Sequence, residues 1–278
     1  MLINRQRCLL YLLKELKICK KIRLAKLLFL IEKDSKVPNL CSFYSFLPYK
    51  YGPYSFEVFH DIDNFEKNRY ISQTDTTIIY ENKEIDIPTE LKLSIDKIIL
   101  NYGKMKDSIL INHVYKNYPE YTIFSEIKKQ RNYKRNKTGI YTIGYQGRSI
   151  DQFLHILIEE KINTLVDIRY NPWSMKYGFK KNTLKILCNK LKIDYQHIPD
   201  LGIPGNLREK LETDKDYKNL FENYKIHLEN QQKYIDFLKE QSKKKRLALM
   251  CFEEDPKYCH RQILGSYLEN SDVMVSIA

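Results

Sequence analysis

The stretch LALMCFEEDPKYCHR at residues 247–261 decides the fold of the second half of this 278-residue chain. Residues 247–252 are apolar and predict a buried strand, and the acidic residues before Pro256 predict a tight turn. The apolar residues of 262–268 recur at helical spacing. We therefore expect a helix whose first turn carries Cys259, His260 and Arg261.

This helix start is the first candidate for a functional site. A helix N-terminus has free backbone N–H groups and a partial positive charge, which lower a thiol pKa and attract anions. The alternative is ordinary packing, and Cys251 within the apolar strand is interpreted as a core residue. Cys251, Cys259 and His260 are also soft metal ligands, but their spacing is not C-x-x-C and a fourth ligand is not evident. No metal is therefore predicted.

The amino-acid composition limits the classes of protein to which this chain can belong. Hydrophobic residues make up 43% of the chain, enough for a core in one large or two ordinary domains. The six cysteines show no disulfide-like spacing, so a reducing, cytoplasmic location is expected. Lys and Arg interrupt the apolar residues of segment 1–21, which predicts neither a signal peptide nor a membrane span. The net charge of +12 favours polyanionic partners such as nucleic acid or a nucleotide.

The first half of the chain has the element order of a winged helix-turn-helix. Helices are predicted at 7–16, 24–31 and 56–65, the last capped by Ser55, followed by a β-hairpin at 70–80. The candidate solvent face of the third helix is too acidic for good base reading, which makes a protein partner at least as well supported as DNA. That face consists of Glu57, His60, Asp61, Asn64 and Lys67.

The segment LPYKYGPYS at residues 47–55, followed by an amphipathic helix, resembles the Panacea domain, also called SocA-like. The later segment YKNYPEYT at 115–122 is similar to one found at the end of such modules. The resemblance covers roughly residues 5–125. It implies a mainly helical, winged-helix-like module that recognises a protein partner through residues 1–125 and has no chemistry of its own.

A basic segment separates the two halves. Residues 128–137, KKQRNYKRNK, contain six basic residues in ten and no apolar face. We therefore predict a recognition domain at 1–127, a basic linker at 128–138 and a second domain at 139–278. The linker is either simply solvated or a strip that binds phosphates.

The second half is predicted to be an α/β domain. A strand at 139–144, a helix at 150–161 and a strand at 163–169 form a βαβ unit, and therefore a parallel sheet. We expect a three-layer, Rossmann-like, mostly parallel sheet, preceded by the winged-helix-like domain. Further helices are predicted at 184–191 and, as one long helix, within 218–242, with strands at 195–198, 247–252 and 274–277.

The polar residues of this half follow the strands, and the carboxyl ends of parallel strands share one edge of the sheet. Gly144 would let a ligand approach the backbone closely, with Tyr145 beside it. Asp167 and Arg169 point the same way, either as a structural ion pair or with Arg169 as a clamp for a phosphate or carboxylate. Trp173 is interpreted first as loop packing and second as a stacking platform.

Four motifs resemble the family called domain of unknown function 488. They are YTIGY at 141–145, VDIRYNPWS at 166–174, LGIP at 201–204 and CFEEDPKYCHR at 251–261. The resemblance spans about residues 139–270 and implies a cytoplasmic α/β domain, without implying a reaction. The Gly-Ile-Pro at 202–204 departs from the Leu-Gly-Gly of many members.

The first functional hypothesis is an enzyme acting on a nucleotide or on a ligand derived from nucleic acid. Cys259 would be the nucleophile or redox thiol, with a pKa well below its ordinary value, beside His260. Glu253 or Asp167 would carry the proton. The anionic group would be held by Arg169, Arg261, Gly144, Tyr145 and Ser174.

Two other hypotheses do not require catalysis. In one, the α/β domain senses an anionic ligand while the first domain engages a protein, as in phage defence or a toxin–antitoxin-like system. In the other, the chain is a DNA-binding regulator that uses the basic residues 128–137, with affinity that falls steeply with salt.

Overall fold

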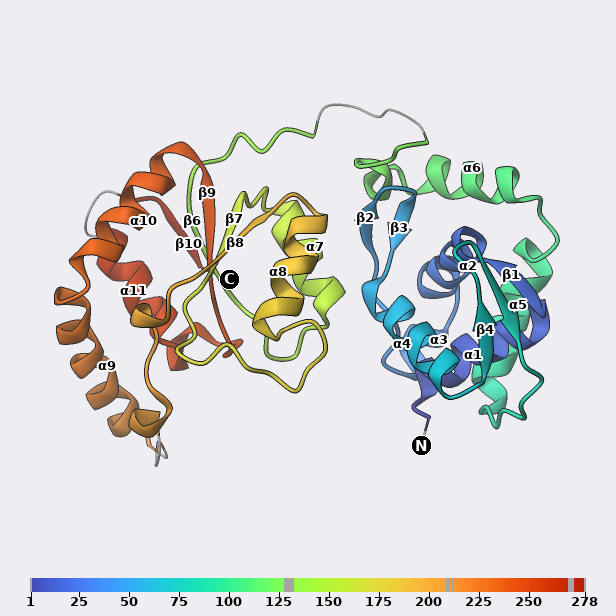
Figure 1. Ribbon diagram of the computed structural model, residues 1–278, viewed down its shortest axis with the longest axis horizontal. Coiled ribbons are helices and arrows are strands. Elements are labelled where there is room, and N and C mark those ends of the chain that lie inside the picture. Colours follow the sequence, from blue (N-terminus) through green and yellow to red (C-terminus); the bar gives the residue numbers. More distant parts are fainter. Residues whose placement is uncertain (1, 128–132, 209–210, 212, 270–272, 278) are drawn as a thin grey trace. The chain divides into compact units, whose positions relative to one another are not determined.

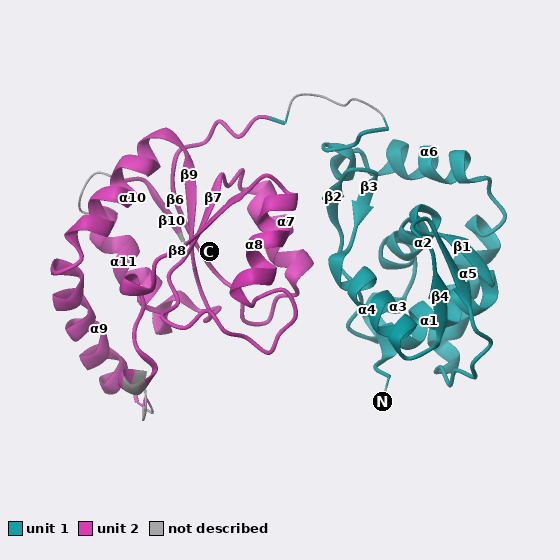
Figure 2. Cartoon of the chain, viewed as in Figure 1, with its two compact units in different colours: residues 1–133 teal, residues 134–278 magenta. Residues whose placement is uncertain are grey.

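The computed structural model describes residues 2–127, 133–208, 211, 213–269 and 273–277. The chain forms two compact units, residues 1–133 and 134–278 (Figure 2). The first part of the predicted basic linker, residues 128–132, lies outside the described residues. Among the residues that are described, no helix combines the length and the apolar character needed to cross a bilayer.

The first unit is mainly helical, with short strands between the helices (Figure 1). Strands β1, β5 and β4 form one antiparallel sheet in that order, and β2 and β3 form a separate hairpin. The helices are α1 (Asn4–Leu16), α2 (Lys21–Asp34), α3 (Val37–Leu40), α4 (Phe56–Lys67), α5 (Thr89–Tyr102) and α6 (Asp107–Asn117). The strands are β1 (Ile18–Lys20), β2 (Leu47–Tyr49), β3 (Gly52–Tyr54), β4 (Ile71–Gln73) and β5 (Thr77–Tyr80).

Helix α4 begins as predicted, because the Ser55 hydroxyl accepts a hydrogen bond from the backbone N–H of Val58 at 3.2 Å. Its predicted solvent face is wrong at two positions. Glu57 and Asp61 are buried, because both carboxylates lie within salt-bridge distance of Arg5 and Asp61 also accepts from the Tyr44 hydroxyl at 2.7 Å. Partners from other elements thus allow charged side chains on the inner face of the helix.

A buried lysine fixes the hairpin of the first unit. Lys26, on α2, is 1% exposed and donates to the carbonyls of Tyr51 at 2.5 Å and Pro53 at 3.3 Å. Burial lowers the pKa of Lys26 from its ordinary value to about 7. A lysine in the unfolded chain titrates near ~10.4, so between these pH values the unfolded chain binds more protons than the folded one.

We therefore expect the first unit to become more stable as pH rises from 7 to 8, on the order of 1 kcal/mol per pH unit. At higher pH the thiols of Cys8 and Cys19, whose pKa is raised by burial, act in the opposite direction. Lys26→Met should abolish this slope, because no group then changes its protonation on unfolding at this position. Lys104→Met, at an exposed lysine of the same unit, should keep it. Urea unfolding followed by circular dichroism at several pH values measures the slope, and a slope that survives in Lys26→Met contradicts the assignment.

The second unit is an α/β domain built on a five-stranded parallel sheet. The strand order is β10-β6-β9-β7-β8, and each neighbouring pair is parallel, as the sequence predicts. The strands are β6 (Gly139–Gly144), β7 (Thr164–Asp167), β8 (Asp194–His197), β9 (Arg246–Cys251) and β10 (Val275–Ile277). Strand β9 lies between β6 and β7, which differs from the order of a dinucleotide-binding Rossmann sheet.

Helices lie on both sides of this sheet (Figure 1). Helices α7 (Ile150–Glu159) and α8 (Lys181–Lys190) lie on one side. Helices α9 (Asp214–Glu229), α10 (Gln232–Lys244) and α11 (His260–Glu269) lie on the other and pack on apolar residues of the central strands. Strand β9 is buried along its whole length, as expected for a central strand covered on both faces.

The long helix predicted within 218–242 is found as two helices. The region 218–242 is not a single helix, because α9 ends at Glu229 and α10 starts at Gln232. At the break, the Asn230 side chain donates to the carbonyl of Ile226 at 3.2 Å, and its backbone N–H donates to His227 and Leu228. Asn closes helix ends in this way because its short side chain competes for backbone groups.

Candidate functional site

A pocket of about 390 Å³ lies at the carboxyl ends of β6, β9 and β7, three neighbouring strands of the parallel sheet. Polar groups line its interior and aromatic side chains line its rim. The predicted site residues that the structure brings to this pocket are Tyr145, Arg169, Ser174 and His260. Its other lining residues are Tyr170, Asn171, Trp173, Ile203, Gly205, Cys251 and Phe252.

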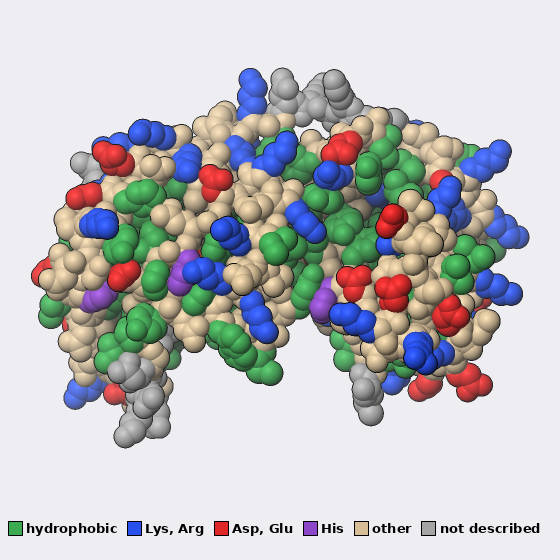
Figure 3. Space-filling view, in the orientation of Figure 1, with side chains coloured by type: hydrophobic (Ala, Val, Ile, Leu, Met, Phe, Trp, Pro, Cys, Tyr) green, Lys and Arg blue, Asp and Glu red, His purple; other side chains and the backbone are tan. Residues whose placement is uncertain are grey.

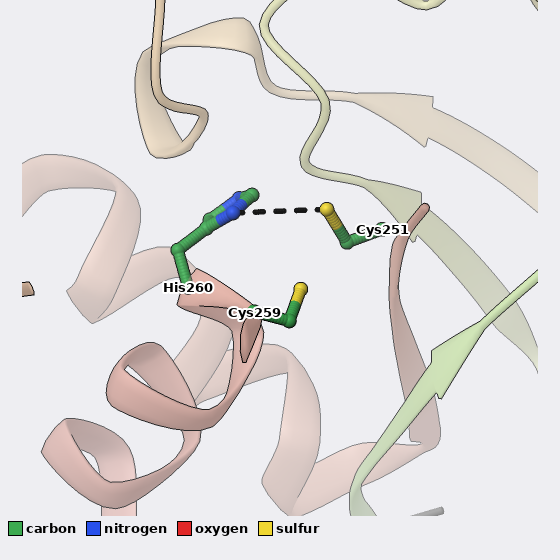
Figure 4. A group of neighbouring side chains, drawn as sticks. All are labelled: Cys251, Cys259 and His260. Carbon is green, nitrogen blue, oxygen red and sulfur yellow. Dashed lines mark hydrogen bonds between the residues drawn. The ribbon is translucent and has the colours of Figure 1, made fainter. Parts of the chain in front are cut away.

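Cys251 and His260 meet in the pocket. Cys251 is the last residue of β9 and His260 the first residue of α11. The Cys251 Sγ lies 3.6 Å from the His260 Nδ1 (Figure 4). The His260 Nε2 lies 3.3 Å from the carbonyl oxygen of Ile168. A proton on Nε2 would be donated to that carbonyl, which leaves Nδ1 to accept from the thiol. This is the geometry of a thiol, a base and a group that orients the base.

A carboxylate also lies beside this thiol. The Cys251 Sγ lies 3.1 Å from the Glu253 Oε2, two residues further along the chain. The sequence interpretation of Cys251 as a plain core residue is therefore incomplete, because it is 2% exposed yet lines the pocket. The available signal was its position as the last apolar-strand residue before the turn, since strand carboxyl ends form the binding edge of such sheets.

Cys259 lies behind this pair and does not line the pocket. It immediately precedes α11 and its backbone N–H donates to the carbonyl of Pro256 at 3.0 Å. The predicted lowering of its pKa is wrong. Burial raises the pKa of the Cys259 thiol well above its ordinary value, and the neighbouring Cys251 adds to the effect, which outweighs the opposite effect of Arg261.

Asp167 and Arg169 form a buried ion pair. The Asp167 carboxylate accepts from the Arg169 Nη2 at 2.6 Å and Nε at 2.8 Å, and from the Tyr195 hydroxyl at 2.6 Å. Burial alone would lower the pKa of Arg169, but hydrogen bonds and charge from Asp167 raise it above its ordinary value. The Arg169 Nη1 donates to the Tyr145 hydroxyl at 3.1 Å, so Arg169 presents a neutralised pair and a fixed phenol to the pocket.

Arg261 does not reach the pocket, contrary to the prediction of an anion clamp. It is fully buried and donates to the backbone carbonyls of Glu253 and Glu254, the latter at 2.7 Å. Its guanidinium therefore holds the acidic turn through two backbone carbonyls. The close approach that Gly144 permits is also internal: a Cβ there would lie 1.7 Å from the carbonyl oxygen of Glu253.

Gly144→Ala should therefore destabilise the second unit by about 1–3 kcal/mol, since the added methyl group forces the turn away from β6. Gly205→Ala is the matched control, because a Cβ there meets nothing within 4 Å and the change should be below about 0.5 kcal/mol. Urea unfolding followed by the fluorescence of Trp173, the sole Trp of the chain, reports on this unit. Equal stabilities for the two variants would contradict the packing described.

Three aromatic side chains form an exposed rim. Tyr170 is 53% exposed, Trp173 60% and Phe252 46%, and all three line the pocket. The Nζ of Lys180 lies 5.8 Å from the Trp173 ring centre. Trp173 is therefore not buried loop packing, and its large exposure around a pocket indicates a surface that a ligand can cover.

Comparison with known proteins bears on the second unit alone. The family model described as "Domain of unknown function DUF488" matches residues 149–268, which supports the resemblance seen in the motifs of this unit. No curated protein and no solved structure matches the chain. The matched region contains β7, β9 and all but the last residue of α11, and so most of the residues that line the pocket.

Proposed function

We propose that the second unit is an enzyme that binds a nucleotide, or the nucleobase of a nucleic acid, in the pocket at the strand carboxyl ends. The observation that carries this proposal is the exposed rim of Tyr170, Trp173 and Phe252 above a polar floor. Stacking of a base on an aromatic side chain contributes about 1–3 kcal/mol and tolerates any base. A rim of this kind suits a flat aromatic ligand better than a simple anion.

The polar floor suits the edge of such a ligand. Arg169, Tyr145 and Ser174 line it, and Arg169 and Tyr145 are held in place by the ion pair with Asp167 and by the hydrogen bond between them. Fixed donors and acceptors discriminate between ligands because a mismatched ligand leaves them unpaired. Lys180 beside Trp173 supplies a positive charge at the rim, where the phosphate of a nucleotide would lie.

The reactive centre of this proposal is the pair Cys251 and His260, in place of the Cys259 that the sequence favours. Both side chains line the pocket and lie 3.6 Å apart, and the carbonyl of Ile168 orients the imidazole. Glu253 remains the candidate proton carrier because its carboxylate lies beside Cys251. Asp167 is not retained in that role, since its oxygens are occupied by Arg169 and Tyr195.

Binding can be measured through Trp173, the sole Trp of the chain. Nucleoside monophosphates should quench its fluorescence, whereas ribose 5-phosphate, which has no base, should not. Tyr170→Ala should weaken binding by about 1–3 kcal/mol, or roughly 5–150-fold, through lost stacking. Ile226→Ala, at an exposed position on α9, is the control and should bind normally. Quenching of equal strength by ribose 5-phosphate would overturn the stacking proposal.

Catalysis is measured in an assay separate from the binding assay. The nucleotide that quenches Trp173 most strongly is incubated with the full chain, and its mass is followed by mass spectrometry. His260→Ala should retain quenching and lose conversion, because the pair with Cys251 is then broken. Binding by the native chain without any conversion would instead support the sensor hypothesis.

For the first unit we propose a winged-helix-like module that recognises a protein. The first unit begins with α1, β1, α2, α3, the β2–β3 hairpin, α4, β4 and β5. This order and the sheet order β1-β5-β4 support the proposal. On α4, the exposed residues Asp63 and Glu66 are acidic and the side chain of Gln73 donates to both. Such a face repels phosphate, which favours a protein partner over DNA. Figure 3 shows Lys and Arg scattered among acidic residues on the visible face, without one basic patch.

Lys67→Ala, at the exposed end of α4, should leave the affinity of the full chain for duplex DNA and its salt dependence unchanged. A lost phosphate contact would reduce the slope of affinity against salt by ~1. Lys134→Ala, in the basic segment, is the matched comparison. A reduced slope for Lys67→Ala alone, measured by fluorescence anisotropy, would favour DNA reading by α4.

A further inference from the structure

We infer that Cys251, Cys259 and His260 form a binding site for a transition metal, with Zn²⁺ as the best match, and that its open fourth position faces the pocket. The three ligand atoms all lie within 4.8 Å of one another. They come from the end of β9, the residue before α11 and the first residue of α11. Figure 4 shows the three side chains pointing toward a common point.

The separation of the donor atoms matches a tetrahedral zinc ion. Zn–S distances of about 2.3 Å and Zn–N distances of about 2.0–2.1 Å at a tetrahedral angle place a sulfur and a nitrogen ~3.6 Å apart. The Cys251 Sγ and the His260 Nδ1 lie 3.6 Å apart. An ion can therefore enter with little movement of these two side chains.

The surroundings of His260 also suit a metal ligand. A histidine that binds a metal usually donates its other ring N–H to a carbonyl or carboxylate, which fixes the tautomer and the ring orientation. The His260 Nε2 lies 3.3 Å from the Ile168 carbonyl, so Nδ1 is the atom left to face the two thiols. Arg261 holds the acidic turn between Cys251 and Cys259 through the carbonyls of Glu253 and Glu254, and thereby fixes the separation of the ligands.

The three protein ligands match a zinc site that keeps one coordination position open, and not a structural site with four protein ligands. Structural zinc sites use four protein ligands, whereas catalytic sites use three, such as two Cys and one His, and keep one position for water or substrate. Cys251 and His260 line the pocket while Cys259 lies behind them, so the fourth position faces the pocket. Soft thiol ligands select zinc over magnesium or calcium.

The reaction class rests on the part of the proposed function that places a nucleobase in the pocket. With a metal bound, Cys251 and His260 would be its ligands, so a metal-bound water would replace the free thiol as the reactive group. A water at the fourth position would lose a proton to the Glu253 carboxylate and attack an electrophilic carbon of the bound base. The proton would then pass to the exocyclic amino group of the base. The C–N bond would break, ammonia would leave and a carbonyl would remain, so one water is consumed and no electrons are transferred. Zinc held by two Cys and one His, with a Glu that is not a ligand, performs hydrolytic deamination of nucleobases in this way.

Metal binding is tested without any substrate. The full chain, kept reduced and freed of metal, is titrated with Co²⁺, which reports tetrahedral thiolate ligation by its visible d–d bands and its near-ultraviolet charge-transfer band. We expect one cobalt ion per chain, displaced by Zn²⁺. Cys251→Ser and Cys259→Ser should each weaken binding more than about 100-fold, since even partners outside the ligand shell change metal affinity by about 10–100-fold.

Cys188→Ser is the matched control, because Cys188 is a fully buried cysteine of α8 in the same unit and is not a ligand. It should bind Co²⁺ as the native chain does. Should a ligand variant fail to fold by Trp173 fluorescence, zinc protection of Cys251 and Cys259 from iodoacetamide in the native chain replaces it. No tetrahedral cobalt spectrum in the folded native chain, or unchanged alkylation with zinc, overturns the inference.

Different results would overturn the metal site and the proposed nucleotide binding. Nucleotide quenching of Trp173 that persists in a chain unable to bind cobalt would overturn the metal site and leave the proposed function standing. A tetrahedral cobalt spectrum in a chain that binds no nucleotide would support the metal site and overturn the proposed function.

Discussion

The parallel pairing of β6, β9 and β7 is the constraint on which the second unit depends. It places the ends of three strands, at Gly144, Cys251 and Asp167, at one edge of the sheet. The central strand β9 is buried from end to end, so its last residue can be held in position by neighbours on both sides. Tyr145 and Cys251 stand at two of these strand ends, Arg169 is held by Asp167 at the third, and His260 contacts Cys251.

The two arginines near this site mainly hold other groups of the protein in place and do not attract a ligand. Arg261 donates its hydrogen bonds to the acidic turn, and Arg169 donates most of its own to Asp167 and to the carbonyl of Phe179. Buried arginines require such partners, because an unpaired buried charge is strongly destabilising. What remains exposed to a ligand is a compact thiol–imidazole centre within an aromatic rim. This division favours a flat ligand with a reactive carbon over a simple anion.

Buried cations in this chain are stabilised in different ways. Arg169 of the second unit pairs with the Asp167 carboxylate. In the first unit, Lys26 donates to backbone carbonyls, and its burial lowers its pKa to about 7, within the physiological range. The same chain therefore contains one buried cation that stays charged and one whose charge depends on pH, which gives the two units different responses to alkaline conditions.

The sequence by itself determined the α/β class of the second unit, its parallel sheet and the strand ends that carry Tyr145, Arg169 and Ser174, because periodicity and strand order are local signals. Tertiary structure decided which groups reach the pocket. Cys251 and Cys259 look alike as cysteines flanking one turn, and the helix start favoured the second. The structure favours Cys251 instead. Arg261 holds the turn between the two cysteines so that Cys259 is buried away from the pocket, while Cys251 lies beside His260 at the pocket. Such a choice depends on contacts between segments far apart in the chain, which no local pattern encodes.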